Sequence, residues 1–380
     1  MKIAVSGIGI VSSLGIGIEA NMTAINRNEG GAVPVRKVPF CNADLALRAG
    51  LGKRCLYSRT ALLGILAVQE ALADSGAGKD LRTGLVSGTS VGGMDRTEVF
   101  YADYLSNPAR GRLRDVVMHD CAASTLAIAR HCGIEGYATT ISTACSSAAN
   151  AILAAARLIR CGIADRVVAG GTDALSLFTL GGFGSLMILD KKPCRPFDAD
   201  RAGLNLGEGA GYIVLQREDT LQKEPYAYFA GGENANDAYH QTASSATGEG
   251  CYKAMHDTLR KAGVAASQID YVNAHGTGTP NNDLSESRAL CRLFGDKVPP
   301  FSSTKGFTGH TLAAAGGIEA VFAVEALRRG VIYPNLNFSR PMEETGLVPV
   351  TERREAPLRY VLSNSLGFGG NCTALLFSKN

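Results

Sequence analysis

The chain has 380 residues, of which 46% are hydrophobic, 19% are charged and 45 are glycine. This length allows two ordinary domains or one large duplicated domain with a substantial core. The net charge of +3 does not argue for nucleic-acid binding. The ten cysteines have no C-x-x-C pair and no regular spacing, which argues against a disulfide scaffold and against a zinc site.

Strand patterns alternate with helix patterns along the chain, which predicts a layered α/β fold. The examples, in chain order, are residues 2–11, 62–74, 83–87, 148–160, 166–169 and 212–215. No signal peptide precedes the first strand pattern, and no apolar run is long enough to span a bilayer. We therefore expect a cytoplasmic protein with reduced thiols and no membrane partner.

Cys145 lies where a strand pattern at residues 137–142 gives way to an alanine-rich helix pattern. Unpaired backbone N–H groups and the helix dipole at such a position favour negative charge, lower the pKa of a thiol and make it a better nucleophile. Because free cysteine is among the most buried residues, a small core cysteine is the alternative interpretation of this window.

The charged stretch at residues 216–224 is the best candidate for a boundary and predicts two halves, 1–224 and 225–380. A weak repeat lies across it. Cys145 precedes a helix pattern that closes at residues 160–162, and His310 precedes one that closes at residues 328–330, each with arginine and then glycine. Gene duplication would produce this repeat, and chance similarity between two alanine-rich helices is the alternative.

Two histidines occupy glycine-rich loops. His275 follows a strand pattern at residues 269–272, and His310 ends a loop that begins at Lys305. Asp283 and Glu286 are three residues apart and can share one helix face. Glu286 could hold Lys305 in an ion pair, although a solvated charged face is the alternative.

Near the C-terminus, residues 364–371 form a glycine-dense turn that can bring backbone N–H groups close to a ligand, as an oxyanion hole requires. Together these segments resemble the β-ketoacyl-acyl carrier protein synthases of the elongating (I and II) type, within the thiolase-like superfamily. Thr-Ala-Cys-Ser-Ser, Asn-Ala-His-Gly-Thr-Gly-Thr, Lys-Gly-x-x-Gly-His and Gly-Phe-Gly-Gly occur in this order, and Arg-Pro-Phe-Asp lies at residues 195–198. The resemblance covers essentially the whole chain and implies a five-layered α-β-α-β-α fold of two duplicated halves.

The resemblance implies an acyltransferase, a 3-oxoacyl-[acyl carrier protein] synthase of fatty acid biosynthesis. Cys145 would carry the growing acyl chain, while His275 and His310 would donate hydrogen bonds during malonyl decarboxylation. The N–H groups of Cys145 and Phe368 would form the oxyanion hole, and Lys305 with Glu286 would order the His310 loop. The resemblance implies that Thr277 and Thr279 contact the phosphopantetheine arm. Phe183 and Phe368 are candidates to line the acyl pocket, with ordinary core aromatics as the alternative, and Gly369 is a further candidate substrate-binding residue.

The resemblance also implies acyl carrier protein as partner, with its phosphopantetheine arm as the only prosthetic group; we expect no metal and no other cofactor. Because acyl carrier protein is strongly acidic, we expect a basic rim around the site. The candidates are Lys53, Arg54, Arg59, Arg112, Arg114, Lys191 and Lys192. A homodimer is expected, and a heterodimer with a related subunit is the alternative.

Several segments depart from the family pattern, among them Asn371-Cys372 after the glycine-dense turn and residues 116–121. Because of these departures, a ketosynthase of a dedicated polyene- or polyketide-type pathway is an alternative prediction for the function. A non-elongating subunit similar to a chain-length factor and a cysteine hydrolase also stay open. Gly7-Ile8-Gly9 suggests a dinucleotide-binding enzyme, but the third glycine of the dinucleotide-binding pattern is misplaced.

Overall fold

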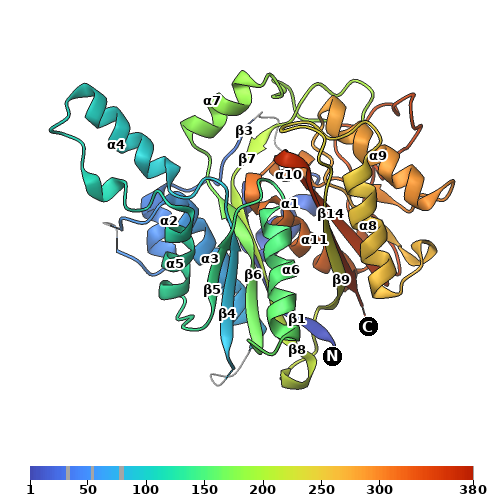
Figure 1. The fold of residues 1–380 in the computed structure, drawn as a ribbon, viewed down its shortest axis with the longest axis horizontal. Coiled ribbons are helices and arrows are strands. Elements are labelled where there is room, and N and C mark those ends of the chain that lie inside the picture. Colours follow the sequence, from blue (N-terminus) through green and yellow to red (C-terminus); the bar gives the residue numbers. More distant parts are fainter. Residues whose placement is uncertain (31–34, 53–54, 77–80, 380) are drawn as a thin grey trace.

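The computed structural model describes residues 1–30, 35–52, 55–76 and 81–379. The first half follows the predicted alternation of strands and helices, and the strand patterns at residues 2–11, 83–87, 137–142 and 166–169 are all strands (Figure 1). Its elements are β1 (Ile3–Ser12), β2 (Gly15–Ile16), α1 (Ile18–Asn26), β3 (Val35–Arg36), α2 (Asn42–Arg48), α3 (Arg59–Ser75), β4 (Thr83–Gly88), α4 (Met94–Ser106), η1 (Leu113–Asp115), α5 (Cys121–His131), β5 (Ala138–Ile141), α6 (Ser147–Arg160), β6 (Arg166–Asp173), α7 (Leu177–Ser185), β7 (Leu206–Gly207), β8 (Gly209–Arg217) and η2 (Glu218–Thr220).

The second half begins after the connection between β8 and β9, which contains the predicted boundary at residues 224 and 225. Its elements are β9 (Ala227–Asn236), α8 (Glu249–Ala262), η3 (Ala266–Gln268), β10 (Tyr271–Asn273), α9 (Pro280–Phe294), β11 (Phe301–Ser302), α10 (Lys305–Thr308), η4 (Leu312–Ala314), α11 (Ala315–Arg329), β12 (Val331–Ile332), β13 (Arg354–Glu355), β14 (Tyr360–Gly367), η5 (Phe368–Gly370) and β15 (Asn371–Ser378).

The two halves repeat one strand topology. The first half has the spatial order β5-β4-β6-β8-β1, and the second has the order β11-β10-β14-β15-β9. When the strands of each half are numbered along the chain, both orders read 3-2-4-5-1. The strand directions also agree, since the first three strands of each order are parallel and the next two pairings are antiparallel. The halves join where β1 pairs with β9 through Ala4 and Val5.

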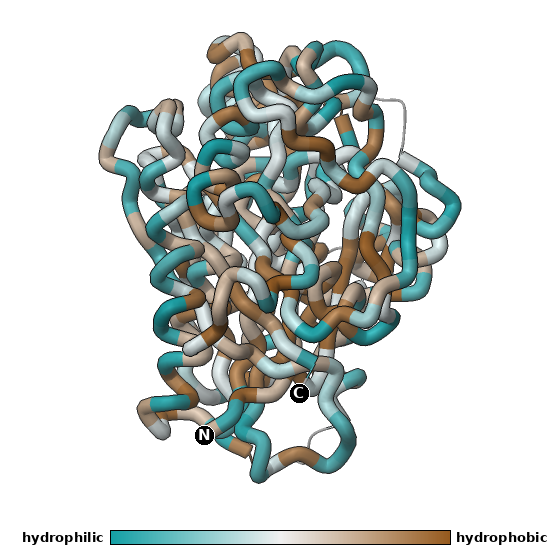
Figure 2. Tube along the Cα trace, turned by 90° about the vertical axis from the view of Figure 1, so that its right-hand side faces the viewer, coloured by the Kyte–Doolittle hydropathy of each residue, from teal (hydrophilic) through white to brown (hydrophobic). Residues whose placement is uncertain are grey.

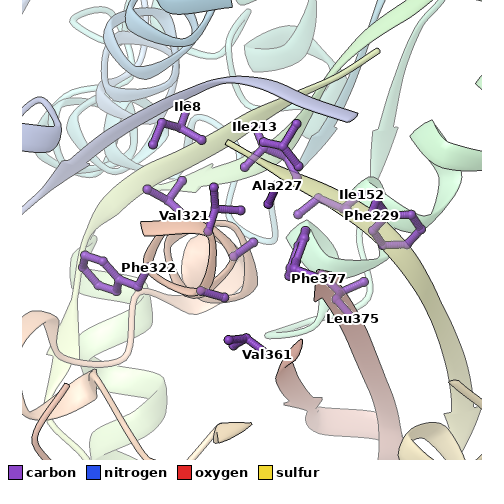
Figure 3. Close-up of a cluster of buried hydrophobic side chains, with 14 of the residues drawn as sticks. Ile8, Ile152, Ile213, Ala227, Phe229, Val321, Phe322, Val361, Leu375 and Phe377 are labelled. Atoms are coloured by element: carbon purple, nitrogen blue, oxygen red, sulfur yellow. The ribbon is translucent and has the colours of Figure 1, made fainter. Parts of the chain in front are cut away.

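Helices lie outside and between the two parts of the sheet, so the described chain forms the predicted α-β-α-β-α layers (Figure 1). The outer layers are α3 with α5 and α8 with α9, while α6 and α11 pack on each other between the sheets. Figure 3 shows this middle layer, where α11, which carries Val321 and Phe322, lies between Ile213 of β8 and Val361 of β14. The thiolase-like fold is thus confirmed.

Gly7 and Gly9 allow α3 to approach β1 closely. A Cβ atom at Gly9 would lie 2.0 Å from the carbonyl oxygen of Ala67, and one at Gly7 would lie 2.2 Å from that of Ala71. Helix–strand packing therefore accounts for the Gly-x-Gly pattern that suggested a dinucleotide site.

Hydrophobic segments run through the interior of the molecule, while many hydrophilic segments lie in its outer turns (Figure 2). The main cluster of buried side chains includes residues of β1, β8, α6 and α11. None of the helices in the described ranges is long and apolar enough to cross a membrane.

Candidate active site

Cys145 lies in a tight turn between β5 and α6, directly before Ser146, the N-cap of α6. Ala144 has φ 51°, a left-handed conformation that is unfavourable for a residue with a side chain. The Ser147 hydroxyl closes the turn by accepting the Thr143 N–H at 2.8 Å and donating to the Ala144 carbonyl at 2.5 Å. A strained turn that presents a nucleophile at the start of a helix is typical of catalytic sites.

Burial raises the pKa of the Cys145 thiol to about 12, while the Lys305 ammonium and the backbone N–H groups of Phe368 and Cys145 act in the opposite direction. The prediction of a lowered pKa is therefore wrong for this structure. The sequence shows that the thiol precedes a helix, but it does not show that Cys145 is only 6% exposed, and removal from water disfavours the thiolate.

His275 follows β10 and is fixed from two sides. Glu286 on α9 accepts the N–H groups of His275 and Gly276 at 2.9 and 2.8 Å. The Lys305 ammonium donates to the His275 carbonyl at 2.5 Å and lies 3.1 Å from its Nδ1. Burial, with the charge of Lys305, lowers the pKa of His275 well below its ordinary value, so the ring is neutral. Nδ1 accepts from Lys305, and the ring proton is therefore on Nε2.

In His310 a backbone N–H, not a lysine, donates to Nδ1. The N–H of Leu312 donates to His310 Nδ1 at 3.0 Å, so the proton of this ring is also on Nε2. Burial and the charge of Lys305 lower the pKa of His310 to about 3. The two imidazole rings are 5.3 Å apart between centroids and nearly perpendicular. The site therefore offers two neutral Nε2–H donors.

Cys145, His275 and His310 line one cavity of about 410 Å³. Thr277 and Thr279 also line it, and their hydroxyl oxygens are 2.8 Å apart. Its further lining is mostly contributed by α7, the loop after it, the loop before α8, the start of α9 and the Gly-Phe-Gly-Gly turn: Phe183, Met187, Ile188, Ala202, Leu204, Thr242, Ala243, Ser244, Pro280, Asn281, Asn282, Leu366, Gly367, Phe368 and Gly370. The rings of Phe183 and Phe368 stack with centroids 5.7 Å apart.

The predicted pairing of Lys305 with Glu286 is wrong. Lys305 forms its ion pair with Glu319 on α11, and the two side chains are only 2% and 3% exposed. Glu286 is occupied by the two backbone N–H groups of the His275 loop and by the Asn364 amide at 3.2 Å. One signal for Glu319 is present in the sequence, because it is a single carboxylate in the apolar run at residues 315–324.

Asn371, one of the departures from the family pattern, connects the Gly-Phe-Gly-Gly turn to the nucleophile turn. Its Oδ1 accepts from the Ser146 hydroxyl at 2.6 Å and from the Asn150 amide at 2.9 Å. Gly367 makes close contact possible, because a Cβ atom there would lie 2.9 Å from the Thr143 carbonyl oxygen.

Two residues, Gly369 and Arg59, do not have the surroundings that their predicted roles require. Gly369 is exposed and is not part of the cavity lining, and its N–H donates to the Gln241 carbonyl at 2.7 Å. Arg59 is not a free surface cation, because its guanidinium binds both carboxylate oxygens of Glu208.

The other predicted rim cations divide into three groups. Arg112 is exposed and lies 3.5 Å from the Asp115 carboxylate. Arg114, Lys191 and Lys192 are exposed. Lys53 and Arg54 lie outside the described residues. Within the described ranges, no group of three or more His, Cys, Asp or Glu side chains is arranged to hold a metal ion.

The comparisons with known proteins identify the family. Residues 55–220 match the family described as "Beta-ketoacyl synthase, N-terminal domain", and residues 226–339 match "Beta-ketoacyl synthase, C-terminal domain". The chain belongs to the β-ketoacyl synthase family. It is therefore an enzyme that transfers acyl groups, as the sequence motifs predicted.

Two relatives in this family match the whole chain, and a third matches most of it. The 3-oxoacyl-[acyl-carrier-protein] synthase 2 of Vibrio cholerae is 34% identical over 100% of this chain and 99% of the relative. The protein of the same name from Rhizobium meliloti is 35% identical over the same shares. The nodulation protein E of Rhizobium meliloti is 36% identical over 84% of this chain and 82% of its own length.

Solved structures agree with the fold. The chain is similar to the ishigamide ketosynthase/chain length factor, with a TM-score of 0.92 and 26% identity over 100% of this chain and 99% of that one. It is also similar to the ketosynthase ApeO in complex with its chain length factor ApeC from Xenorhabdus doucetiae, with a TM-score of 0.85 and 30% identity over 100% and 98%.

Proposed function

We propose that this β-ketoacyl synthase extends acyl chains on acyl carrier protein by decarboxylative condensation with malonyl-acyl carrier protein, in fatty acid biosynthesis. The observation that carries the proposal is the meeting of Cys145, His275 and His310 in one cavity, with a hydrogen-bond donor at Nδ1 of each imidazole. The names of the full-length relatives support this substrate class.

In the first step, the Cys145 sulfur attacks the thioester of acyl carrier protein. A new sulfur–carbon bond forms, and the pantetheine thiol leaves with the proton that the Cys145 thiol gives up. Covalent attachment divides the reaction into acyl transfer and condensation. We assign the backbone N–H groups of Cys145 and Phe368, which both act to lower the pKa of the thiol, as the donors to the oxyanion of the tetrahedral intermediate.

In the second step, the bond between the malonyl carboxylate and its methylene carbon breaks and carbon dioxide leaves. The electron pair moves towards the malonyl thioester oxygen, where the Nε2–H groups of His275 and His310 stabilise the enolate. The enolate carbon then attacks the acyl carbon, the new carbon–carbon bond forms, and the Cys145 sulfur leaves. We assign the hydroxyls of Thr277 and Thr279, which line the same cavity, as contacts of the pantetheine arm.

The test is a reaction of the purified protein with acyl- and malonyl-acyl carrier proteins, followed by mass spectrometry. We expect an acyl adduct on Cys145 and a product longer by two carbons, with the release of carbon dioxide. Hydrolysis of the acyl thioester without extension would favour a cysteine hydrolase instead. Absence of any adduct on Cys145 would favour a non-elongating subunit similar to a chain-length factor.

We propose that acyl carrier protein docks near Lys191 and Lys192. Both are exposed, and they follow the cavity residues Met187 and Ile188 in the chain. Two exposed lysines this close in sequence to the cavity lining would attract an acidic partner. The double variant Lys191→Glu/Lys192→Glu should raise KM for acyl carrier protein and leave kcat close to wild type. Unchanged KM at low salt would contradict the docking site.

We propose that the protein works as a dimer of identical chains. Strand β5 is an edge strand that is only half-buried, and an unprotected edge favours pairing with another chain. Helix α4 projects from the molecule (Figure 1) and has no buried residue. Its exposed apolar side chains include Val99, Tyr101, Tyr104 and Leu105.

Two further proposals concern the partner and the compartment. Because two similar solved structures are named as ketosynthases with a chain length factor, a related chain is the second candidate for the partner position. All ten cysteines lie in the described ranges and all are free thiols, which supports a reducing compartment such as the cytoplasm.

A further inference from the structure

Asp173 is a buried carboxylate outside the sequence motifs of the site. It is the last residue of β6, it has no exposed surface, and it is not part of the cavity lining. Its oxygens receive hydrogen bonds from two other segments. The Ser90 hydroxyl donates to Oδ2 and the Thr89 hydroxyl donates to Oδ1, each at 2.6 Å, in the loop after β4.

The second segment is η4, which begins two residues after His310. The N–H of Ala313 donates to Asp173 Oδ2 at 2.9 Å. The preceding residue, Leu312, has φ 55°, a left-handed conformation that costs free energy for a leucine and persists only when neighbouring contacts hold it. The contact between Asp173 and Ala313 is adjacent to this strained residue.

Leu312 is also the residue whose N–H donates to His310 Nδ1. A carboxylate, a backbone N–H, a strained peptide and an imidazole therefore form one continuous chain from the end of β6 to the site. This chain crosses the boundary between the halves, since Asp173 belongs to the first half and His310 to the second.

We propose that Asp173 is a positioning residue, which holds the strained Leu312 peptide so that His310 keeps its proton on Nε2 and directs it into the cavity. This inference rests on the function proposed above and adds a residue to it. Asp173 acts through the backbone and does not touch the reacting atoms. Without its acceptor oxygen, the Leu312 peptide relaxes and His310 loses the bond that fixes its tautomer.

The test compares two half-reactions of the holoenzyme with acyl carrier protein. In Asp173→Asn, we expect malonyl decarboxylation to fall by at least about tenfold relative to acyl loading of Cys145, because a displaced donor weakens enolate stabilisation. Ser90→Ala removes one hydrogen bond to the same carboxylate and should shift the ratio in the same direction by a smaller factor. It also keeps the test available if Asp173→Asn folds poorly.

Asp198→Asn is the matched control. Asp198 is equally buried and accepts the Ser339 N–H at 2.5 Å and the Ser339 hydroxyl at 2.7 Å, but none of its hydrogen-bond partners belongs to the His310 segment. The Asp198→Asn variant should keep the wild-type ratio of decarboxylation to acyl loading even if its thermal stability is lower. An equal change of the ratio in Asp198→Asn would overturn the proposal.

Nitrogen NMR of ¹⁵N-histidine-labelled protein gives a readout that a purely structural role would not change. The wild type should show His310 as the Nε2–H tautomer, and Asp173→Asn should lose this single tautomer. Retention of the tautomer together with a wild-type ratio would overturn the role of Asp173. A wild-type protein that neither loads acyl chains nor decarboxylates malonyl groups would instead overturn the proposed function.

Discussion

In both site histidines, the hydrogen bond at Nδ1 decides that Nε2 carries the proton. Lys305 engages Nδ1 of His275, and the Leu312 N–H engages Nδ1 of His310, so both rings turn Nε2–H towards substrate. Burial keeps both rings neutral. A neutral imidazole that donates one proton suits an oxygen that gains charge only during decarboxylation.

Substitution of one donor should separate the two half-reactions. In His310→Ala, we expect malonyl decarboxylation to fall by about 100-fold, since loss of one oxyanion donor typically costs roughly 10²–10³ in rate. Acyl loading of Cys145 should be partly retained, because its oxyanion donors are backbone N–H groups. Carbon dioxide release and adduct mass measure the two steps separately, and unchanged decarboxylation would contradict the role of His310.

The depressed histidine pKa values predict a stability that depends on pH. The unfolded chain titrates histidine near its ordinary pKa of 6.5, whereas the buried His310 has a pKa of about 3. Between these values the unfolded state binds more protons, so the free energy of unfolding decreases as pH falls below about 6.5. Each such histidine contributes a slope of about 1.4 kcal/mol per pH unit.

Urea unfolding of wild type and His310→Asn at pH 7, 6, 5 and 4.5 measures this slope. The variant should lose one histidine contribution, and its free energy of unfolding should fall less steeply with decreasing pH. Parallel curves for the two proteins would show that His310 is not buried in its neutral form.

At the scale of elements, Lys305 and the His275 loop are each held by a carboxylate from another helix. Lys305 at the start of α10 pairs with Glu319 on α11, while Glu286 on α9 holds the backbone after β10. Both carboxylates are buried, but only Glu319 neutralises the ammonium. Breaking a buried ion pair by removing one partner typically costs roughly 3–5 kcal/mol.

A double-mutant cycle distinguishes the observed partner from the predicted one. Lys305→Met and Glu319→Leu should each destabilise the protein by about 3 kcal/mol or more, and the double variant should be more stable than the sum of the two effects predicts. The same cycle with Glu286→Gln in place of Glu319→Leu should show clearly weaker coupling. Chemical denaturation measures both cycles, and equal coupling energies would contradict the assignment of Glu319.

At the scale of the whole molecule, the site lies where the two repeated halves meet. Helices α6 and α11 occupy corresponding positions in the two halves and pack on each other. Cys145 precedes the first helix and His310 precedes the second. The repeated topology supports gene duplication over chance similarity, and the position of the site shows why neither half contains all three side chains.

If the protein is a dimer that uses α4, a charged substitution on this helix should weaken it. Leu105→Glu on α4 places a charge at a side chain that is 65% exposed in the single chain, so it should cost little in the fold but weaken an interface there. Light scattering should show a shift from dimer towards monomer. Ile163→Glu, at an exposed apolar residue beyond α6, is the control and should leave the dimer intact. A monomeric wild type would contradict the proposal.

Several features followed from the sequence alone because their causes are local. Hydrophobic periodicity predicted the strands and helices, such as β1 and α6, and the order of the motifs around Cys145, His275 and His310 predicted the family. The repeat of a reactive residue before an alanine-rich helix was also visible, because it depends only on residue types and spacing.

Only the tertiary structure decided the partners of the buried charges and the ionisation of the thiol. Lys305 could pair with Glu286 or Glu319 by residue type, and the packing of α11 against the site selected Glu319. The position of Cys145 before a helix favoured a lower pKa of the thiol, but burial away from water raised that pKa instead. The ion pair of Lys305 and the pKa of Cys145 both depend on which segments, distant in sequence, pack around these side chains and exclude water from them. The spacing of residues along the chain does not predict that packing.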